Sequence, residues 1–428
     1  MDTEWLKRAY PEYFTTAPKK VTDLVVLRGE GNYLYSIDGE KYLDFVQGVA
    51  TNALGHCHPS LVSAAVNQLQ SLGHASFNLV SYPSALLLAA GLRNHTGRLD
   101  KYFFTNSGAE AVESGIKLSR FISGKSSVIA YRGSFHGRTM GAASVTGSSV
   151  KFRKHYAPFL PQVYFAPYPY CFRCPFHQHM ENCSLDCLNY LLEDFELIIP
   201  SEDTAAVIFE PVMGEGGYVV PPKKYVKGLS DFCKEKRIWL MFDEVQSGMG
   251  RTGKMFAFEH FGVEPDILLL GKAVGGGYPL AVVAANREIM DQWPPGSHGS
   301  TFGGHPVACA AGSAQLEIIG KPEFLDSVNE KGVFFRNLLI SLQQKHSRIG
   351  DVRGLGLMNA VELVHADKTA DPKLANSMIA YLFSRKILAY SCGAKGNILR
   401  FMPPLNVEKN VLEFLVQTLD DGLSQIDE

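Results

Sequence analysis

The chain has 428 residues, of which 46% are hydrophobic and 20% are charged, and its 41 Lys and Arg against 43 Asp and Glu leave a formal net charge of −2. This balance argues against a nucleic-acid-binding protein or one held on an anionic membrane, since both need a basic excess. No apolar run approaches the roughly 20 residues of a membrane helix, and the first residues, MDTEWLKRAYPEYF, have no apolar core of a secretory signal. Eight cysteines in so long a chain do not form a disulfide scaffold, so we expect a reduced, cytoplasmic setting.

The first fifty residues are predicted to form short strands. Residues 21–39 and 41–48 have the apolar and turn residues of strands, punctuated by Gly29, Gly31 and Gly39. From about Pro59, helical patterns alternate with short apolar runs. A single core rarely grows past roughly 250–300 residues, so the length predicts more than one lobe.

The clearest unit lies between residues 205 and 243. Residues 205–211 and 238–245 are apolar runs of strand length, and residues 223–237 between them carry an apolar stripe at helical spacing. A third apolar strand is predicted over 266–272. Continuous apolar strands separated by an amphipathic helix indicate a parallel sheet covered on both faces.

Ligands of such sheets bind at the carboxyl ends of the strands. Asp243 and Lys272 stand at two of these ends, Glu210 stands at a third, and the loop 105–108 follows the predicted strand KYFF. We therefore expect the functional residues of the chain to lie along this edge of the sheet.

The last hundred residues differ from this pattern. Helices are predicted over 325–345, 371–386 and 407–425, with strands over 351–364 and 397–405. This mixture predicts a small α+β lobe, which the N-terminal strands are expected to join.

Lys272 follows four apolar residues and would be poorly hydrated. Desolvation lowers the pKa of an amine and makes it a better nucleophile toward an aldehyde. The alternative is a lysine that extends to the surface from a strand end. Asp243 could keep a pyridinium nitrogen protonated, or it could cap the following turn.

Other segments could bind anions or a flat ring. The turn 106–111 opens a helix and could present backbone N–H groups to a phosphate, and Ser300 and Thr301 could add hydroxyls. Phe135 could stack on a cofactor, and Arg138 and Arg400 could each pair with a carboxylate. Each of these features alone is also compatible with an ordinary loop or a surface arginine. Arg400 is the more suggestive arginine, because it lies within an apolar strand pattern.

Together and in this order, the segments resemble the class III aminotransferases, which depend on pyridoxal phosphate (PLP). The resemblance covers almost the whole chain and rests on the motifs GHCHP (55–59), TNSGAEA (105–111), SFHGRT (134–139), EPVMGEGG (210–217), FDEVQSGMGRTG (242–253), GKAVGGGYPL (271–280), STFGGHP (300–306), DVRGLGLM (351–358) and NILR (397–400).

The resemblance implies the α/β fold of type I PLP enzymes. A large, mostly parallel sheet domain with helices on both faces would span residues 55–308. A small α+β domain would span residues 309–428 and be joined by residues 1–54. The active site would lie at the interface of a homodimer or a dimer of dimers.

The same resemblance assigns the cofactor residues. Lys272 would be the Schiff-base lysine and Asp243 the partner of the pyridinium nitrogen. The other implied PLP contacts are Ser107, Gly108 and Ala109 at the phosphate, Phe135, His136 and Val245 around the ring, Gln246 at the phenolic oxygen, and Thr301 from the partner subunit.

The motifs are most similar to those of 4-aminobutyrate aminotransferases and related epimerases. In that subgroup Arg138 would bind the distal carboxylate of the donor, and Arg400 the α-carboxylate of 2-oxoglutarate. Glu215 would pair with Arg400 when no α-carboxylate is present. Val49, where isoleucine is common, would contact the substrate, and Met213 stands where glutamine is common, so both positions bear on substrate identity.

The implied reaction is a ping-pong transfer of the amino group from an ω-amino acid to 2-oxoglutarate. Three alternatives stay open: a PLP-dependent amino-acid racemase or epimerase, an ornithine or acetylornithine aminotransferase, and a non-catalytic protein on the same scaffold. Arg138 weighs against racemisation, since a nonpolar amino acid offers it no partner.

Four cysteines are closely spaced at positions 171, 174, 183 and 187. Two such pairs are compatible with a zinc or iron–sulfur clip, and the alternative is four reduced thiols in a surface insertion. Their spacing matches no standard metal template, and the predicted chemistry needs no metal.

Overall fold

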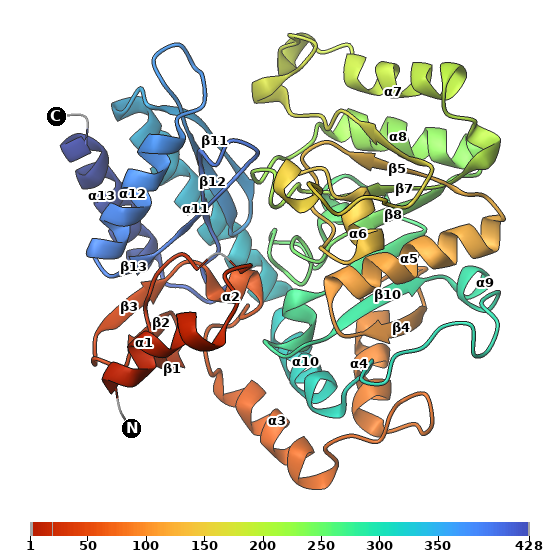
Figure 1. Ribbon diagram of the computed structural model, residues 1–428, viewed down its shortest axis with the longest axis horizontal. Coiled ribbons are helices and arrows are strands. Elements are labelled where there is room, and N and C mark those ends of the chain that lie inside the picture. The colour runs from red at the N-terminus through yellow and green to blue at the C-terminus, as the bar shows by residue number, and fades with distance from the viewer. Residues whose placement is uncertain (1–2, 19, 427–428) are drawn as a thin grey trace.

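The computed structural model describes residues 3–18 and 20–426 (Figure 1). Residues 1–2, 19 and 427–428, which belong to the predicted N- and C-terminal segments, lie outside the described residues. The larger part of the chain is built on a seven-stranded sheet in the order β4-β10-β9-β8-β7-β5-β6. Its strands are β4 (Lys101–Thr105), β5 (Ser127–Tyr131), β6 (Val163–Ala166), β7 (Thr204–Phe209), β8 (Trp239–Asp243), β9 (Ile267–Leu270) and β10 (Ala281–Ala285).

The sheet is mostly parallel, as predicted. The pairs β5–β6, β5–β7, β7–β8 and β8–β9 are parallel, whereas β10 runs antiparallel to both β9 and β4. Because β7, β8 and β9 point the same way, their carboxyl ends meet at one edge of the sheet.

Helices cover both faces of this sheet (Figure 1). Side chains alternate along a strand, so Ile267 and Leu269 pack into the core that contains Val112 of α5 (Gly108–Ser123). Leu268 packs into the opposite core, with Tyr225 of α8 (Lys223–Lys236). Burial on both faces explains why these strands are continuous apolar runs.

Two further sheets have four strands each, in the orders β1-β2-β3-β13 and β11-β12-β15-β14. Their strands are β1 (Val26–Glu30), β2 (Tyr33–Ser36), β3 (Lys41–Asp44), β11 (Ile349–Leu355), β12 (Met358–Leu363), β13 (Ile387–Leu388), β14 (Tyr390–Cys392) and β15 (Ile398–Phe401). Leu43 pairs with Ile387, so the N-terminal strands share a sheet with the C-terminal part. The proposed division at residues 54 and 308 stays a prediction, and its second boundary falls within α10 (Pro306–Ile319).

The remaining helices are α1 (Thr3–Tyr13), α2 (Gln47–Ala50), α3 (Pro59–Ser71), α4 (Pro83–Arg93), α6 (Met140–Val145), α7 (Asp186–Leu197), α9 (Arg287–Met290), α11 (Pro322–Lys345), α12 (Pro372–Ser384) and α13 (Lys409–Ile426). The last three lie close to the helices predicted there. Within residues 3–18 and 20–426, no helix has both the length and the apolar composition needed to cross a membrane.

Two predicted strands were wrong in detail. Residues 351–364 form the β11–β12 hairpin instead of one strand, because Gly356 turns the chain at φ +51° and packs against the Thr252 backbone, where a Cβ would lie 2.3 Å from the carbonyl carbon. The predicted strand 41–48 ends at Asp44. The Asp44 carboxylate accepts the N–H groups of Val46 and Gln47 at 2.7 and 3.0 Å, and these contacts start a left-handed turn over 47–50.

Candidate active site

A cavity of about 460 Å³ lies at the carboxyl edge of the parallel strands. Asp243 ends β8, Glu210 follows β7 by one residue, and Lys272 follows β9 by two. All three line the cavity, so the edge predicted from the strand pattern is a pocket. Its other lining residues are Gly108, Ala109, Phe135, His136, Gly137, Arg138, Thr139, Glu215, Val245 and Gln246.

Lys272 combines an unusual backbone with a perturbed amine. Its φ of +47° lies in the left-handed region, which costs a non-glycine residue about 1–3 kcal/mol and persists only where the surroundings impose it. Burial lowers the pKa of the amine to about 8, although Asp243 partly opposes this shift. The amine is therefore more nucleophilic at neutral pH than an ordinary lysine.

His136 orients the Asp243 carboxylate. The His136 Nδ1 and Asp243 Oδ2 atoms are 2.7 Å apart, and Asp243 Oδ1 accepts the Val245 N–H at 3.0 Å. Both side chains are buried. Fixed in this way, one carboxylate can face a cationic ring nitrogen without rotating away from it.

Glu210 is a structural anchor whose role the sequence did not reveal. Its two carboxylate oxygens accept the N–H groups of Phe135 and Gly214, each at 2.8 Å. Burial raises the Glu210 pKa to about 7, while His136 lowers it and Asp243 raises it. The residue ties the Phe135 loop to the turn that carries Glu215. An acid directly after a buried strand was its only signal in the sequence.

The N-terminus of α5 opens onto the cavity. Gly108 and Ala109 line the cavity, whereas Ser107 is exposed and caps the helix by accepting the Glu110 N–H at 3.2 Å. A Cβ on Gly108 would lie 2.8 Å from Val245 Cγ1, so only glycine allows this close approach. The free N–H groups of a helix start form an anion site.

Thr301 does not reach either cavity within the chain. Its side chain is exposed and it is absent from both linings, although the neighbouring Ser300 hydroxyl accepts the Asn106 amide at 2.8 Å. Its predicted contribution to a second subunit therefore stays a prediction.

The predicted substrate residues gather around a second cavity of about 600 Å³. It shares Phe135, Arg138, Glu215, Gln246 and Lys272 with the first cavity and adds Val49 and Arg400. The two cavities thus adjoin each other at Lys272, and all four residues predicted to select the substrate line the second one.

Arg400 is a fully buried cation with one carboxylate partner. It lies in β15 with 1% of its surface exposed, and its Nη2 atom is 2.9 Å from Glu215 Oε2. Its guanidinium also lies over the Tyr390 ring at 4.9 Å. The pairing of Glu215 with Arg400 that the resemblance implied is therefore present in the geometry.

Arg138 and Gln246 have well-defined neighbours. The exposed Arg138 guanidinium lies 5.1 Å from the Phe135 ring and 5.0 Å from the Phe152 ring. Gln246 Oε1 accepts the Tyr218 hydroxyl at 2.8 Å. The aromatic pair orients Arg138 toward the cavity, and Tyr218 fixes the Gln246 amide.

The four closely spaced cysteines all line one small cavity. Among the residues that the structure describes, no three His, Cys, Asp or Glu side chains form a group suited to a metal ion. The fold therefore brings the four thiols to one place, and both interpretations of their role stay predictions.

Comparisons with known proteins identify the family of the chain, and the relatives differ in the substrates for which they are named. A family model described as aminotransferase class-III matches residues 15–423. The chain is 39% identical to an acetylornithine aminotransferase of Methanocaldococcus jannaschii, over 94% of each chain. It is 35% identical to a probable 4-aminobutyrate aminotransferase of Bacillus subtilis, over 93% of this chain and 92% of that one. It is also 35% identical to a leucine/methionine racemase of Thermococcus litoralis, over 100% of this chain and 95% of that one.

A solved structure confirms the predicted fold. The PLP-bound amine transaminase of an uncultivated Pseudomonas species is 30% identical and has a TM-score of 0.89, covering 97% of this chain and 98% of that one. This α/β fold is that of the type I PLP enzymes. The chain belongs to the class III aminotransferases and is a PLP-dependent enzyme.

Proposed function

We propose that the enzyme moves the amino group of an ω-amino acid similar to 4-aminobutyrate to 2-oxoglutarate. The observation that carries this proposal is the ion pair between Arg400 and Glu215. A buried arginine suits the α-carboxylate of 2-oxoglutarate, but a donor without an α-carboxylate would leave it unpaired at a high cost. Glu215 supplies the missing countercharge, so one site accepts both substrates.

The residues around Lys272 fit PLP chemically. The cavity offers an amine with a lowered pKa, an oriented buried carboxylate and a helix start suited to a phosphate. We propose that Lys272 would bind the aldehyde carbon of PLP and that Asp243 would face its ring nitrogen. Ser107, Gly108, Ala109 and a second subunit's Thr301 would hold the phosphate, and Phe135, His136, Val245 and Gln246 would surround the ring. When bound, PLP supplies an electron sink that weakens the C–H bond next to the substrate amine.

The chain's own residues then bind the substrate and move the proton. Lys272 Nζ accepts a proton from the substrate carbon and carries it, a task for which a pKa near 8 is well matched. The Asp243 carboxylate, held by His136, stabilises positive charge at the ring nitrogen. Arg138 binds the distal carboxylate, which places the amine end of the donor near Lys272.

A donor-by-acceptor activity panel with a chiral readout tests the proposal. We expect transfer from 4-aminobutyrate to 2-oxoglutarate, with little transfer from ornithine or acetylornithine. If ornithine or acetylornithine is the better donor, the proposed donor is wrong. Formation of a D-amino acid from an L-amino acid without any oxo acid would instead identify a racemase or epimerase, the activity named for one relative.

We also propose that the enzyme is a cytoplasmic homodimer or dimer of dimers. Large apolar side chains are exposed beside and within α4, including Leu79 with 81% and Leu87 with 64% of their surfaces accessible. An exposed Thr301 outside both cavities also suits a site completed by a second chain. Sedimentation of the holoenzyme tests the proposed oligomeric state, and a stable active monomer would contradict it.

A further inference from the structure

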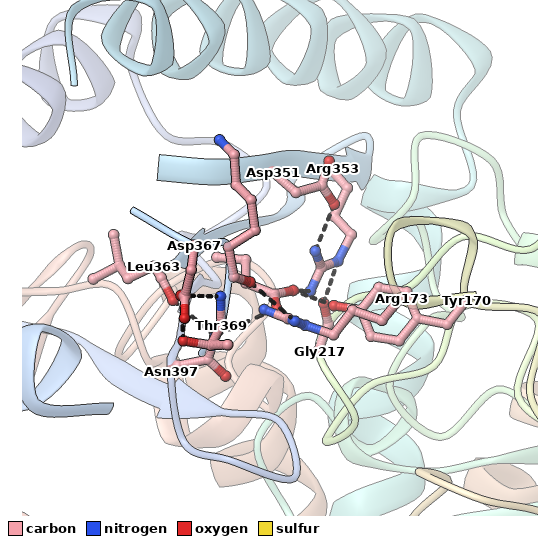
Figure 2. Close-up of polar contacts among 11 residues, drawn as sticks. Tyr170, Arg173, Gly217, Asp351, Arg353, Leu363, Asp367, Thr369 and Asn397 are labelled. Carbon is pink, nitrogen blue, oxygen red and sulfur yellow. Dashed lines mark hydrogen bonds and ion pairs between the residues drawn. The ribbon is translucent and has the colours of Figure 1, made fainter. Parts of the chain in front are cut away.

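A buried ionic network joins the β11–β12 hairpin to the large-domain side of the chain (Figure 2). Glu362 of β12 has a fully buried side chain and forms an ion pair with Arg353 Nη2 at 2.9 Å. Its carboxylate also accepts hydrogen bonds from the Tyr170 hydroxyl and from Arg173 Nε. The Asn397 amide is a further donor at 3.3 Å. One carboxylate therefore receives donors from both parts of the chain.

Arg353 is the residue that links this network to the turn carrying Glu215. Its Nη1 donates to Asp351 Oδ2 at 2.6 Å, and its Nε donates to the Gly217 carbonyl oxygen at 2.7 Å (Figure 2). Asp351 lies opposite Glu362 in the hairpin, where two carboxylates would repel each other without a cation between them. The guanidinium thus donates two hydrogen bonds and forms an ion pair with Glu362, and its planar fork suits several acceptors at once better than the compact ammonium of a lysine does.

The turn that carries Glu215 is tightly packed against the small-domain strands. Met213 and Val219 close the turn through backbone hydrogen bonds of 3.0 and 3.2 Å, and the Glu215 carbonyl accepts the Gly393 N–H at 2.8 Å. Gly217 has φ +128°, and a Cβ there would lie 3.0 Å from Arg353 Nη2. The backbone of this turn therefore rests directly on the arginine.

The same network positions the strand that carries Arg400. Glu362 pairs with Ile398 across the β12–β15 ladder, and Arg400 pairs with Ala360 two positions further on. Residues two apart on a strand share a face, so Arg400 and Ile398 face the same side. Arg353 thus connects the strand of Arg400 to the turn of Glu215.

We infer that Arg353 is a positioning residue for the Glu215–Arg400 pair. It holds the backbone of the turn while the Glu215 side chain leaves Arg400 for an arriving α-carboxylate and returns afterwards. Arg353 thereby sets the preference between substrates with and without an α-carboxylate. This inference rests on the proposed function of the pair.

The test compares two half-reactions of the holoenzyme, one with 4-aminobutyrate and one with L-glutamate. In R353M the turn loses its anchor, so Glu215 pairs poorly with Arg400 when no α-carboxylate is present. We expect the 4-aminobutyrate rate to fall roughly tenfold more than the L-glutamate rate, as for the loss of one charge-assisted hydrogen bond. R353K keeps the charge and serves as the milder variant if R353M does not fold. Asp351→Asn is the matched control, because it leaves the bond to Gly217 intact.

Hydrogen exchange of the peptide 213–219 in the apoenzyme gives a readout independent of activity. We expect faster exchange in R353M and R353K than in Asp351→Asn and the wild type. The inference would be overturned if the Arg353 variants lost the same factor in rate with both substrates. It would also be overturned if neither the hydrogen exchange of the peptide nor the ratio of the two rates changed. If the wild-type enzyme does not react with 4-aminobutyrate, the proposed function itself is wrong. In that case, exchange in the Arg353 variants still decides whether Arg353 holds the turn.

Discussion

Arg400 Nη2 lies 2.9 Å from Glu215 Oε2, whereas Nε and Nη1 of the same guanidinium have no hydrogen-bond partner among the described residues. A buried arginine with two unsatisfied nitrogens is unusual, because each costs free energy on burial. These free donors are suited to a second, incoming carboxylate. This geometry supports the proposed role of the pair as a switch between two substrates.

Replacing Glu215 with Gln is expected to separate the two half-reactions. The substitution leaves Arg400 without a countercharge only when the substrate has no α-carboxylate, a loss of about 1–3 kcal/mol or roughly 10–100-fold in rate. We expect the rate with 4-aminobutyrate to fall by this factor and the rate with L-glutamate to change little. Single-turnover kinetics measure both rates, and equal losses would contradict the switch.

Replacing Arg138 with Leu is expected to weaken the binding of amino donors that have a distal carboxylate. The guanidinium lies beside the edge-to-face pair of Phe135 and Phe152 rings and lines both cavities. The loss of a charge-assisted contact should raise the KM for 4-aminobutyrate roughly 10–100-fold. The KM for a simple primary amine should stay the same. Arg132→Leu, at an exposed position outside both cavities, is the control. A similar rise in KM with the control would point to a general effect of lost surface charge.

The sequence predicted those site residues whose position follows directly from the pattern of the strands. Asp243 and Lys272 could be placed together because the carboxyl ends of parallel strands meet at one edge. The roles of Glu210 and Arg353 could not be predicted, since each acts on backbone groups of a distant segment that only the tertiary fold brings near. The left-handed turn after Asp44 was missed for a related reason. Its cause is a side-chain cap rather than a residue with a strong turn preference.

The amine of Lys272 is expected to react at lower pH than an ordinary lysine. Burial disfavours the charged form and lowers the pKa from 10.5 to about 8, so the neutral amine forms as the pH rises through about 8. The rate at which the apoenzyme captures pyridoxal should therefore rise with a midpoint near pH 8. Absorbance measures this capture. Lys272→Ala should show neither lasting absorbance nor turnover, and an active alanine variant would contradict the assignment of Lys272.

Glu362 is expected to stabilise the fold at neutral pH and to lose this effect in acid. Burial alone would raise its pKa, but Arg353, Tyr170 and Arg173 outweigh burial and hold the pKa below 4.5. A carboxylate with a depressed pKa stabilises the fold above its ordinary pKa, and the effect is lost as the pH falls through the depressed value. Glu362→Gln removes one of the two carboxylates paired with Arg353, while Asp351 stays as the other, so the loss of a charge-assisted contact should cost about 1.5–3 kcal/mol at pH 7. Thermal melting of the apoenzyme should therefore show a large loss at pH 7 and a smaller one near pH 3. Glu413→Gln, on the exposed face of α13, should change neither melting temperature, and equal losses for Glu362→Gln at both pH values would show that its charge is not the cause.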